Sequence, residues 1–252
     1  MNHLFIIGAQ RSGSTYLYHL LNTHPHVLMA QPVQPEPKFF LNDKLYAKGR
    51  EFYEAAYFNS WTNETRYLGE KGTSYIETET VAQRIREFYP NARILMILRD
   101  PVQRAWSNYR FSVQHGLEPL DFKTALVAES DRLKHAAFNT SVNPYAYRRR
   151  GHYIDYIKTY LNIFDANQVC ILILEEIAGN LKGVQALYRW LNIDDSFNPP
   201  TLGEIINPTN VKGEAPIKAL RDLASGYQQS QEMLESYLGR RIEMWRRHWE
   251  TL

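Results

Sequence analysis

One short segment near the N-terminus constrains this chain more than any other. Residues 4–7 are apolar, Gly8 and Gly13 space the turn that follows, and Ser14 and Thr15 end that turn with two hydroxyl side chains. Glycine lets a backbone approach a ligand closely and take positive φ, and the unpaired N–H groups at the start of a helix attract anions. The segment therefore predicts a strand, a phosphate-binding loop and a helix that begins near Ser14.

The spacing of this loop is close to the nucleoside-triphosphate pattern G-x-x-x-x-G-K-[ST], but Ser14 occupies the lysine position. In a nucleoside triphosphatase this lysine reaches the terminal phosphates and the next hydroxyl holds magnesium. The cation in this turn is instead Arg11. We therefore expect a phosphate-like ligand other than a magnesium triphosphate. A nucleotide or small-molecule kinase stays open as the alternative, and it would need magnesium and the missing lysine.

A second segment points to the same edge of a sheet. Residues 93–98 read as a buried strand, and Arg99 follows it. Asp100 can cap a helix whose first residue is Pro101, and Ser107 lies two turns further on. In an open parallel sheet, ligands bind outside the carboxyl ends of strands at a switch point. The first loop and the turn at Arg99 are therefore expected to share one ligand.

These two segments resemble the nucleotide-binding motifs of sulfotransferases that use 3′-phosphoadenosine 5′-phosphosulfate (PAPS). Residues 8–17 resemble the family's 5′-phosphosulfate loop, and residues 99–109 resemble its 3′-phosphate motif. The first likeness implies that the phosphosulfate is bound by Gln10, Arg11, Ser12, Gly13, Ser14 and Thr15. The second implies that the 3′-phosphate is bound by Arg99 and Ser107.

Two segments between these motifs are similar to the heparan-sulfate 3-O-sulfotransferase branch of the family. Residues 34–40 look like its acidic-then-Phe-Phe segment, in which the glutamate is the general base, and residues 69–75 look like its Glu-Lys-Thr-Pro segment. The resemblance implies that Glu36 is the base and Lys71 an electrostatic helper. Thr73 stands where that branch has its proline, which is a departure from the pattern.

Two later segments carry further candidate contacts with the nucleotide. Residues 147–153 form a basic cluster before an expected helix, which reads either as a solvated helix entrance or, by the resemblance, as the source of a nucleotide contact from Arg148. Residues 198–216 read as an irregular loop, where the family places a segment that closes over the nucleotide. Lys212 and Gly213 would then donate to the 3′-phosphate, although Lys-Gly is common in loops.

The hydrophobic pattern predicts a single α/β domain over residues 1–252, with a central, mostly parallel sheet flanked by helices and a P-loop-like core. Residues 31–50 read as loop within an acceptor-side loop and helix of residues 31–60, and residues 116–150 are a candidate lid. Glu70 either orients Lys71 or only ends a strand. The strands are expected at residues 4–7, 27–29, 67–69, 93–98 and 169–174.

The composition of the chain excludes several other classes of protein. A chain of 252 residues with 44% hydrophobic residues can bury one sizeable core, and a net charge of +2 does not favour a nucleic-acid partner. Cys170 is the only cysteine, which fits a reducing compartment and excludes a disulfide within the chain. We expect no membrane span, no targeting segment and no metal site, and hence a cytoplasmic enzyme.

The sequence thus predicts a PAPS-dependent O-sulfotransferase, expected to be a bacterial, cytosolic member of its family. It would move a sulfuryl group in line to a hydroxyl of a small-molecule, glycolipid or carbohydrate acceptor and release 3′-phosphoadenosine 5′-phosphate (PAP). Besides the kinase, a non-catalytic nucleotide-binding protein stays open, but such a protein would have no use for Glu36 and Lys71 together.

Overall fold

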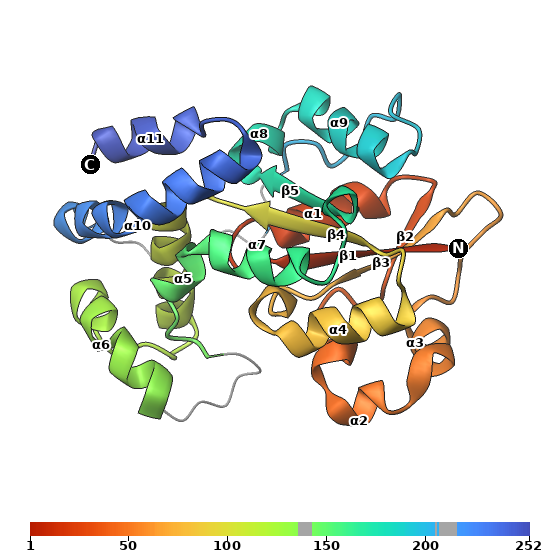
Figure 1. Ribbon diagram of the computed structural model, residues 1–252, viewed down its shortest axis with the longest axis horizontal. Helices are drawn as coiled ribbons and strands as arrows, with labels where there is room; N and C mark the ends of the chain where they lie inside the picture. The colour runs from red at the N-terminus through yellow and green to blue at the C-terminus, as the bar shows by residue number, and fades with distance from the viewer. Residues whose placement is uncertain (136–142, 205, 207–215) are drawn as a thin grey trace. The chain divides into compact units, whose positions relative to one another are not determined.

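The fold is built on a parallel sheet. A computed structural model describes residues 1–135, 143–204, 206 and 216–252. Within them the sheet has five strands in the order β2-β3-β1-β4-β5, and every pairing is parallel (Figure 1). The strands are β1 (Asn2–Gly8), β2 (Val27–Met29), β3 (Tyr67–Lys71), β4 (Arg93–Leu98) and β5 (Val169–Ile173). The predicted α/β class is confirmed, and β3 runs two residues further than expected, to Lys71.

Helices occupy most of the connections between strands. They are α1 (Ser14–Asn22), α2 (Asp43–Tyr46), α3 (Gly49–Tyr57), α4 (Glu79–Phe88), α5 (Pro101–Gln114), α6 (Phe122–His135), α7 (Tyr153–Leu161), α8 (Leu174–Ile177), α9 (Leu181–Leu191), α10 (Ile217–Leu238) and α11 (Glu243–Glu250). Short 3₁₀ turns add η1 (Phe39–Leu41), η2 (Tyr75–Glu77), η3 (Arg149–Gly151) and η4 (Ala166–Gln168).

The expectation of loop for the whole of residues 31–50 is wrong, because α2 and the start of α3 lie within that stretch. The side chain of Asn42 accepts hydrogen bonds from the N–H groups of Lys44 and Leu45, which satisfies the exposed donors at the start of α2. Segments rich in proline can still be followed at once by a capped helix.

The described residues group into two compact units. Unit 1 contains Met1–Leu98 and Ile157–Asn207, and unit 2 contains Arg99–Tyr156 and Pro208–Leu252. Unit 1 includes the whole sheet, with β1 between β3 and β4. The order of strands reverses at β1, so the loop after β1 leaves the sheet at a topological switch point.

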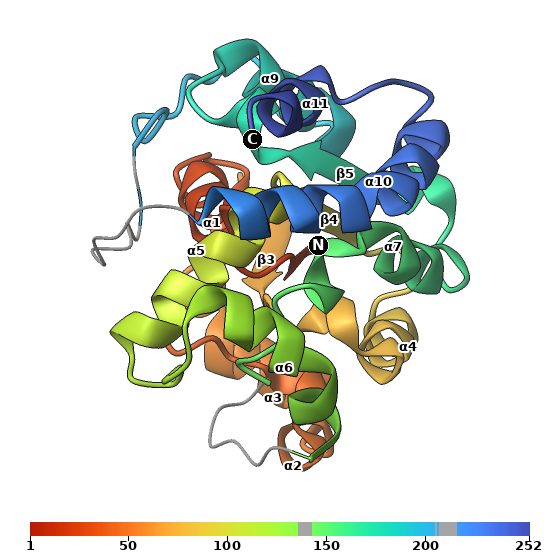
Figure 2. The ribbon, with the colours of Figure 1, turned by 90° about the vertical axis from the view of Figure 1, so that its left-hand side faces the viewer.

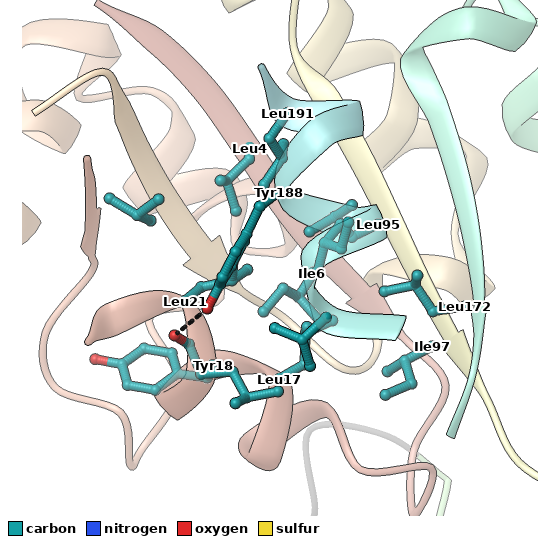
Figure 3. Packing of buried hydrophobic residues seen from close by; sticks show 14 of the residues in the cluster. Leu4, Ile6, Leu17, Tyr18, Leu21, Leu95, Ile97, Leu172, Tyr188 and Leu191 are labelled. Carbon is teal, nitrogen blue, oxygen red and sulfur yellow. Dashed lines mark hydrogen bonds between the residues drawn. The ribbon is translucent and has the colours of Figure 1, made fainter. Parts of the chain in front are cut away.

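One face of the sheet in unit 1 is covered by α1 and α9. Leu4 and Ile6 of β1 pack with Leu17 of α1 and Tyr188 of α9, and all four are buried (Figure 3). The hydroxyl of Tyr188 donates to the carbonyl of Leu20 at 3.5 Å, which ties the two helices together. The apolar residues of α1 therefore face the core.

The opposite face of unit 1 carries an aromatic cluster. Phe5 alternates with Leu4 and Ile6 along β1, so its side chain leaves the other side of the sheet. Its ring lies 5.3 Å from that of Phe40 and 6.0 Å from that of Tyr89. This cluster matters for function because Phe40 closely follows the predicted base, Glu36.

Unit 2 has its own core, formed by α5, α6 and α10 (Figure 2). Ala105, Phe122 and Leu220 come from these three helices and are buried. Trp106 stacks on Tyr109 at 5.4 Å against this core. The candidate lid at residues 116–150 stays a prediction. Helix α6 belongs to that stretch and packs in this core, whereas residues 136–142 lie outside the described residues.

Candidate active site

The predicted phosphate loop lies between β1 and α1. Gly8 has φ 147°, Gly13 precedes α1 with φ 85°, and Arg11 has φ 63°, a left-handed conformation that a side chain normally disfavours by about 1–2 kcal/mol. Ala9 donates its N–H to the carbonyl of Ile97 at 2.8 Å, which fixes the turn to the neighbouring strand β4. Such strain at a loop is characteristic of functional sites.

Several features of this loop are suited to an anion. Gly13 has a positive φ that favours glycine, and a Cβ there would lie 2.5 Å from Cδ1 of Leu174. The hydroxyl of Ser12 is buried, and among the described residues it has no hydrogen-bond partner. No side chain caps the N-terminus of α1. The unpaired helix N–H groups and this hydroxyl are suited to an anion.

A lysine from another strand lies at the end of this loop. Lys71, the last residue of β3, is buried, and its Nζ donates to Oγ1 of Thr15 at 3.3 Å. The ammonium group therefore lies at the first turn of α1, beside Ser14 at the lysine position. Sequence reasoning assigned Lys71 to the site but did not predict that it would contact Thr15.

The predicted base and helper form an ion pair. Nζ of Lys71 lies 3.1 Å from Oε1 of Glu36, and both side chains are largely buried, with 4% and 11% of their surface exposed. Thr73 donates its backbone N–H to Oε2 of Glu36 at 3.1 Å and its hydroxyl to Oε1 at 3.0 Å. Three segments distant in the sequence thus meet, and they place a carboxylate beside the phosphate loop.

Thr73, which the sequence showed only as a departure from a pattern, contacts the predicted base directly. A proline has no backbone N–H and no hydroxyl, so the proline of the resembled segment could make neither bond to Glu36. The signal that could have revealed this role is a hydrogen-bonding residue two positions after Lys71.

The aromatic cluster anchors the loop that carries Glu36. Phe39 and Phe40 are fully buried, and their rings lie 4.7 Å and 5.2 Å from that of Tyr53 on α3. The N–H of Phe40 donates to the hydroxyl of Tyr75 at 3.2 Å. The two phenylalanines therefore fix the backbone near Glu36 without touching its carboxylate.

In unit 2, Arg99 directly precedes α5. Asp100 caps this helix as predicted, since its Oδ1 accepts from the N–H of Val102 at 2.8 Å. Nη2 of Arg99 donates to Oε1 of Gln103 at 3.1 Å, and Tyr153 donates its hydroxyl to the Arg99 carbonyl at 2.7 Å. Tyr153 therefore fixes the Arg99 backbone, and Gln103 orients its guanidinium group.

The C-terminal helix α11 supports the same turn, which the sequence did not reveal. Nδ1 of His248 lies 2.6 Å from Oδ2 of Asp100, and the indole N–H of Trp249 donates to the same carboxylate at 3.2 Å. Ser107 lies in the second turn of α5.

The predicted contact residue Arg148 is exposed and begins the turn η3. Its N–H donates to Oε2 of Glu129 at 2.6 Å, and the N–H of Arg149 donates to Oε1 at 2.9 Å. Burial raises the pKa of Glu129, although these hydrogen bonds oppose the shift. Lys212 and Gly213 lie outside the described residues, so their predicted role stays a prediction.

None of the described helices is long and apolar enough to cross a membrane. The described residues also contain no group of three or more histidine, cysteine, aspartate or glutamate side chains that could hold a metal ion.

A parallel sheet with a glycine loop between its central strand and the next helix defines a P-loop-like α/β protein. The model of the family described as "Sulfotransferase domain" matches residues 1–209. The chain therefore belongs to the sulfotransferase family, which confirms the resemblance seen in the sequence.

Individual relatives agree with this family. The chain is 32% identical over 179 residues to bifunctional heparan sulfate N-deacetylase/N-sulfotransferase 1 of Mus musculus. The aligned segment covers 67% of this chain and 19% of that protein. It is 29% identical over 201 residues to heparan sulfate glucosamine 3-O-sulfotransferase 5 of Mus musculus, and this alignment covers 79% of this chain and 54% of that protein. The chain thus spans from about a fifth to about half of these curated relatives.

A solved structure extends the likeness to the whole chain. The crystal structure of a sulfotransferase from Alicyclobacillus acidocaldarius superposes with a TM-score of 0.79 at 26% identity, covering 98% of this chain and 99% of that one. The matched relatives are sulfotransferases, so sulfuryl transfer is the class of reaction that they support, and a kinase is not favoured.

Proposed function

We propose that this protein transfers a sulfuryl group from PAPS to an acceptor hydroxyl, with Glu36 as the general base. The observation that carries the proposal is the continuous set of contacts from Glu36 through Lys71 to Thr15. It combines a proton acceptor, a buried cation and the phosphate loop in one place. These are the three parts that an in-line group transfer without a metal requires.

The residues of the loop fit the phosphosulfate end of PAPS. Gly13 allows the positive φ of the turn, the hydroxyl of Ser12 lacks a partner among the described residues, and the N–H groups of α1 are unpaired by any side-chain cap. We propose that Gln10, Arg11, Ser12, Gly13, Ser14 and Thr15 bind this end. When bound, PAPS supplies the activated sulfuryl group.

Each group of the chain has a distinct part in the reaction. Glu36 accepts the proton of the acceptor hydroxyl as the acceptor oxygen forms its bond to sulfur. The bond from sulfur to the bridging phosphate oxygen breaks at the same time, and its electron pair leaves on the 5′-phosphate. Lys71, Arg11 and the loop N–H groups stabilise that developing charge, which is the role of preorganised donors in many enzymes.

We further propose that Arg99, Ser107 and Arg148 of unit 2 bind the 3′-phosphate, with Lys212 and Gly213 as additional donors. Support comes from the fixed Arg99 backbone and from Glu129, which holds the turn at Arg148. A guanidinium group is suited to a phosphate because it donates two parallel hydrogen bonds.

The acceptor is proposed by class. Relatives named for heparan sulfate favour a carbohydrate, and a small hydroxylated molecule or a glycolipid would meet the same chemical requirement. The proposal places the reaction in the cytoplasm, because the single thiol of Cys170 cannot form a disulfide within the chain.

Calorimetric titration tests the proposal. We expect PAP to bind without a metal, and to bind more tightly than adenosine 5′-monophosphate, which lacks the 3′-phosphate. ATP with magnesium is the comparison. Preference for ATP and a requirement for magnesium would overturn the proposal and favour a kinase.

A further inference from the structure

Behind the ion pair lies a second carboxylate. Glu70 precedes Lys71 on β3, and successive side chains of a strand leave opposite faces. Glu70 is fully buried on the side of the aromatic cluster. Tyr53 of α3 donates its hydroxyl to Oε2 of Glu70 at 2.7 Å, and Tyr75 of η2 donates to Oε1 at 2.5 Å. A buried carboxylate with two such partners is a costly arrangement for a group without a role.

One of these tyrosines leads from Glu70 back to the predicted base. The hydroxyl of Tyr75 donates to Glu70 and accepts the N–H of Phe40, which lies four residues after Glu36. The carbonyl of Tyr75 accepts a further hydrogen bond from Tyr160 at 2.8 Å. Tyr53 makes no contact of this kind with the Phe40 backbone: its hydroxyl bond runs to Glu70.

We propose that Glu70 is a positioning residue for sulfuryl transfer, which as an ionised carboxylate accepts the Tyr75 hydroxyl and through it holds the Glu36 loop. The inference rests on the proposed role of Glu36 as the base. It gives Glu70 a function that neither simple strand termination nor orientation of Lys71 would supply.

The electrostatic surroundings of Glu70 agree with this role. Burial raises its pKa to about 7, hydrogen bonds from Tyr53 and Tyr75 oppose the shift, and the charge of Glu36 adds to it. The titratable side chains that the structure places around Glu70 are Glu36, Tyr53, Tyr57, Tyr75 and Tyr89. The pKa values of these tyrosines are raised, so they stay neutral near pH 7.

A matched pair of variants separates the two parts of the proposal. Tyr53→Phe and Tyr75→Phe each remove one buried hydroxyl and one hydrogen bond to Glu70, but only Tyr75→Phe also leaves the Phe40 N–H without its acceptor. We expect turnover to fall about tenfold or more in Tyr75→Phe, since small displacements of a catalytic group are costly, and to change less than about threefold in Tyr53→Phe. Equal losses in both variants would overturn the positioning role.

Glu70→Gln tests the charge. In the wild type we expect turnover of PAPS with p-nitrophenol or a desulfated heparan oligosaccharide to decline as pH falls through about 7, because Glu70 becomes protonated. The turnover of Glu70→Gln should lack this decline and stay, at every pH, near the level that the wild type reaches at low pH. A decline that persists unchanged in Glu70→Gln would overturn the charge role.

A direct reading of ionisation completes the test. Carbon-13 resonance of carboxyl-labelled glutamate, assigned with Glu70→Gln, should show one carboxyl titrating near pH 7 in the wild type. Its pKa should rise in Tyr53→Phe and Tyr75→Phe, which remove stabilising donors, and fall in Glu36→Gln, which removes a negative neighbour. If the pKa read from this resonance is the same in Glu36→Gln as in the wild type, the coupling of Glu36 to Glu70 is refuted. Calorimetric binding of PAP should be unchanged in all four variants; if the wild type itself fails to bind PAP, the proposed function fails rather than this inference.

Discussion

The ammonium group of Lys71 lies 3.3 Å from the hydroxyl of Thr15, although the two residues are 56 positions apart. Lys71 ends strand β3 and Thr15 lies in the first turn of α1, so the cation reaches the phosphate loop from the neighbouring strand. The same ammonium lies 3.1 Å from Glu36. One buried side chain therefore connects the group proposed to remove a proton with the loop proposed to bind the leaving phosphate.

Replacing Glu36 with glutamine should remove the base and leave the nucleotide site intact. We expect turnover to fall by about 10²–10⁴-fold, the usual contribution of a general base, while the Kd for PAP changes little. Steady-state kinetics and calorimetry measure the two effects. Glu51→Gln, which alters an exposed carboxylate on α3, is the control. Full activity in Glu36→Gln would remove the assignment.

The bonds from Thr73 to Glu36 predict an order among three variants. Thr73→Ser keeps both donors and should remain close to the wild type. Thr73→Val loses the hydroxyl, and Thr73→Pro loses the hydroxyl and the N–H together, so we expect turnover to decline in that order. Each lost bond to a charged group corresponds to about 1.5–3 kcal/mol. The order would be refuted by a proline variant as active as the serine variant.

Gly13→Ala should destabilise the fold and weaken binding to PAP. The added Cβ would lie 2.5 Å from Leu174 at a positive φ, and such overpacking costs about 1–3 kcal/mol. Gly116→Ala is a matched control, because Gly116 also has positive φ but nothing lies within 4 Å of its Cβ position. Urea unfolding should show the larger loss for Gly13→Ala. Combination with Leu174→Ala should recover part of it, and strict additivity would argue against the clash.

Arg99→Ala should affect recognition of the 3′-phosphate rather than the chemical step. We expect the Kd for PAP to rise by roughly tenfold or more, since a charged hydrogen bond is lost, while turnover at saturating PAPS changes much less. Adenosine 5′-phosphosulfate, which lacks the 3′-phosphate, should lose little affinity in the same variant. Arg241→Ala, at an exposed position of unit 2, is the control. Equal losses for both nucleotides would point to a disturbed fold instead.

The ion pair between Glu235 of α10 and Arg246 of α11 predicts a dependence of stability on pH. Burial alone would raise the pKa of Glu235, but hydrogen bonds from Arg246, Gln231 and the Ile242 N–H outweigh it and hold the pKa at about 2. A carboxyl whose pKa is lowered on folding stabilises the protein above its unfolded value of about 4.5, and this contribution disappears as pH falls towards 2.

Arg246→Met should therefore lower the free energy of unfolding at pH 7 by on the order of 2–3 kcal/mol and by less at pH 3. Chemical denaturation at the two pH values measures the difference. Arg241→Met, which changes a nearby exposed arginine, is the control. A loss of the same size at both pH values would show that packing, rather than charge, accounts for the effect.

Much of the fold follows from local sequence. Short apolar runs bounded by glycine, proline and polar residues give all the strands of the described sheet, and the alternation of strands and helices gives their parallel arrangement. Asp100 caps α5 as its position before Pro101 predicted. The helix α2 was missed because the prolines before it suggested loop, whereas Asn42 alone suffices to begin a short helix.

The residues of the candidate site likewise divide into those that the sequence predicted and those that it missed. Motif resemblance identified Glu36, Lys71 and the phosphate loop, and these residues do come together. It missed Thr73, Tyr75 and Glu129, which act through hydrogen bonds to residues 19 to 37 positions away. Such partners share no local spacing, so no periodic pattern reveals them.

By itself, the sequence determined the strand, glycine loop and helix of the proposed anion site, because backbone conformation and apolar spacing are local properties of neighbouring residues. Only the tertiary structure decided that the ammonium group of Lys71 contacts Thr15 at the loop, that Thr73 holds Glu36, and that Glu70 lies buried between two tyrosines. Parallel strands separated by long connections bring these groups together, and the distances between their side chains depend on the register and packing of the whole sheet.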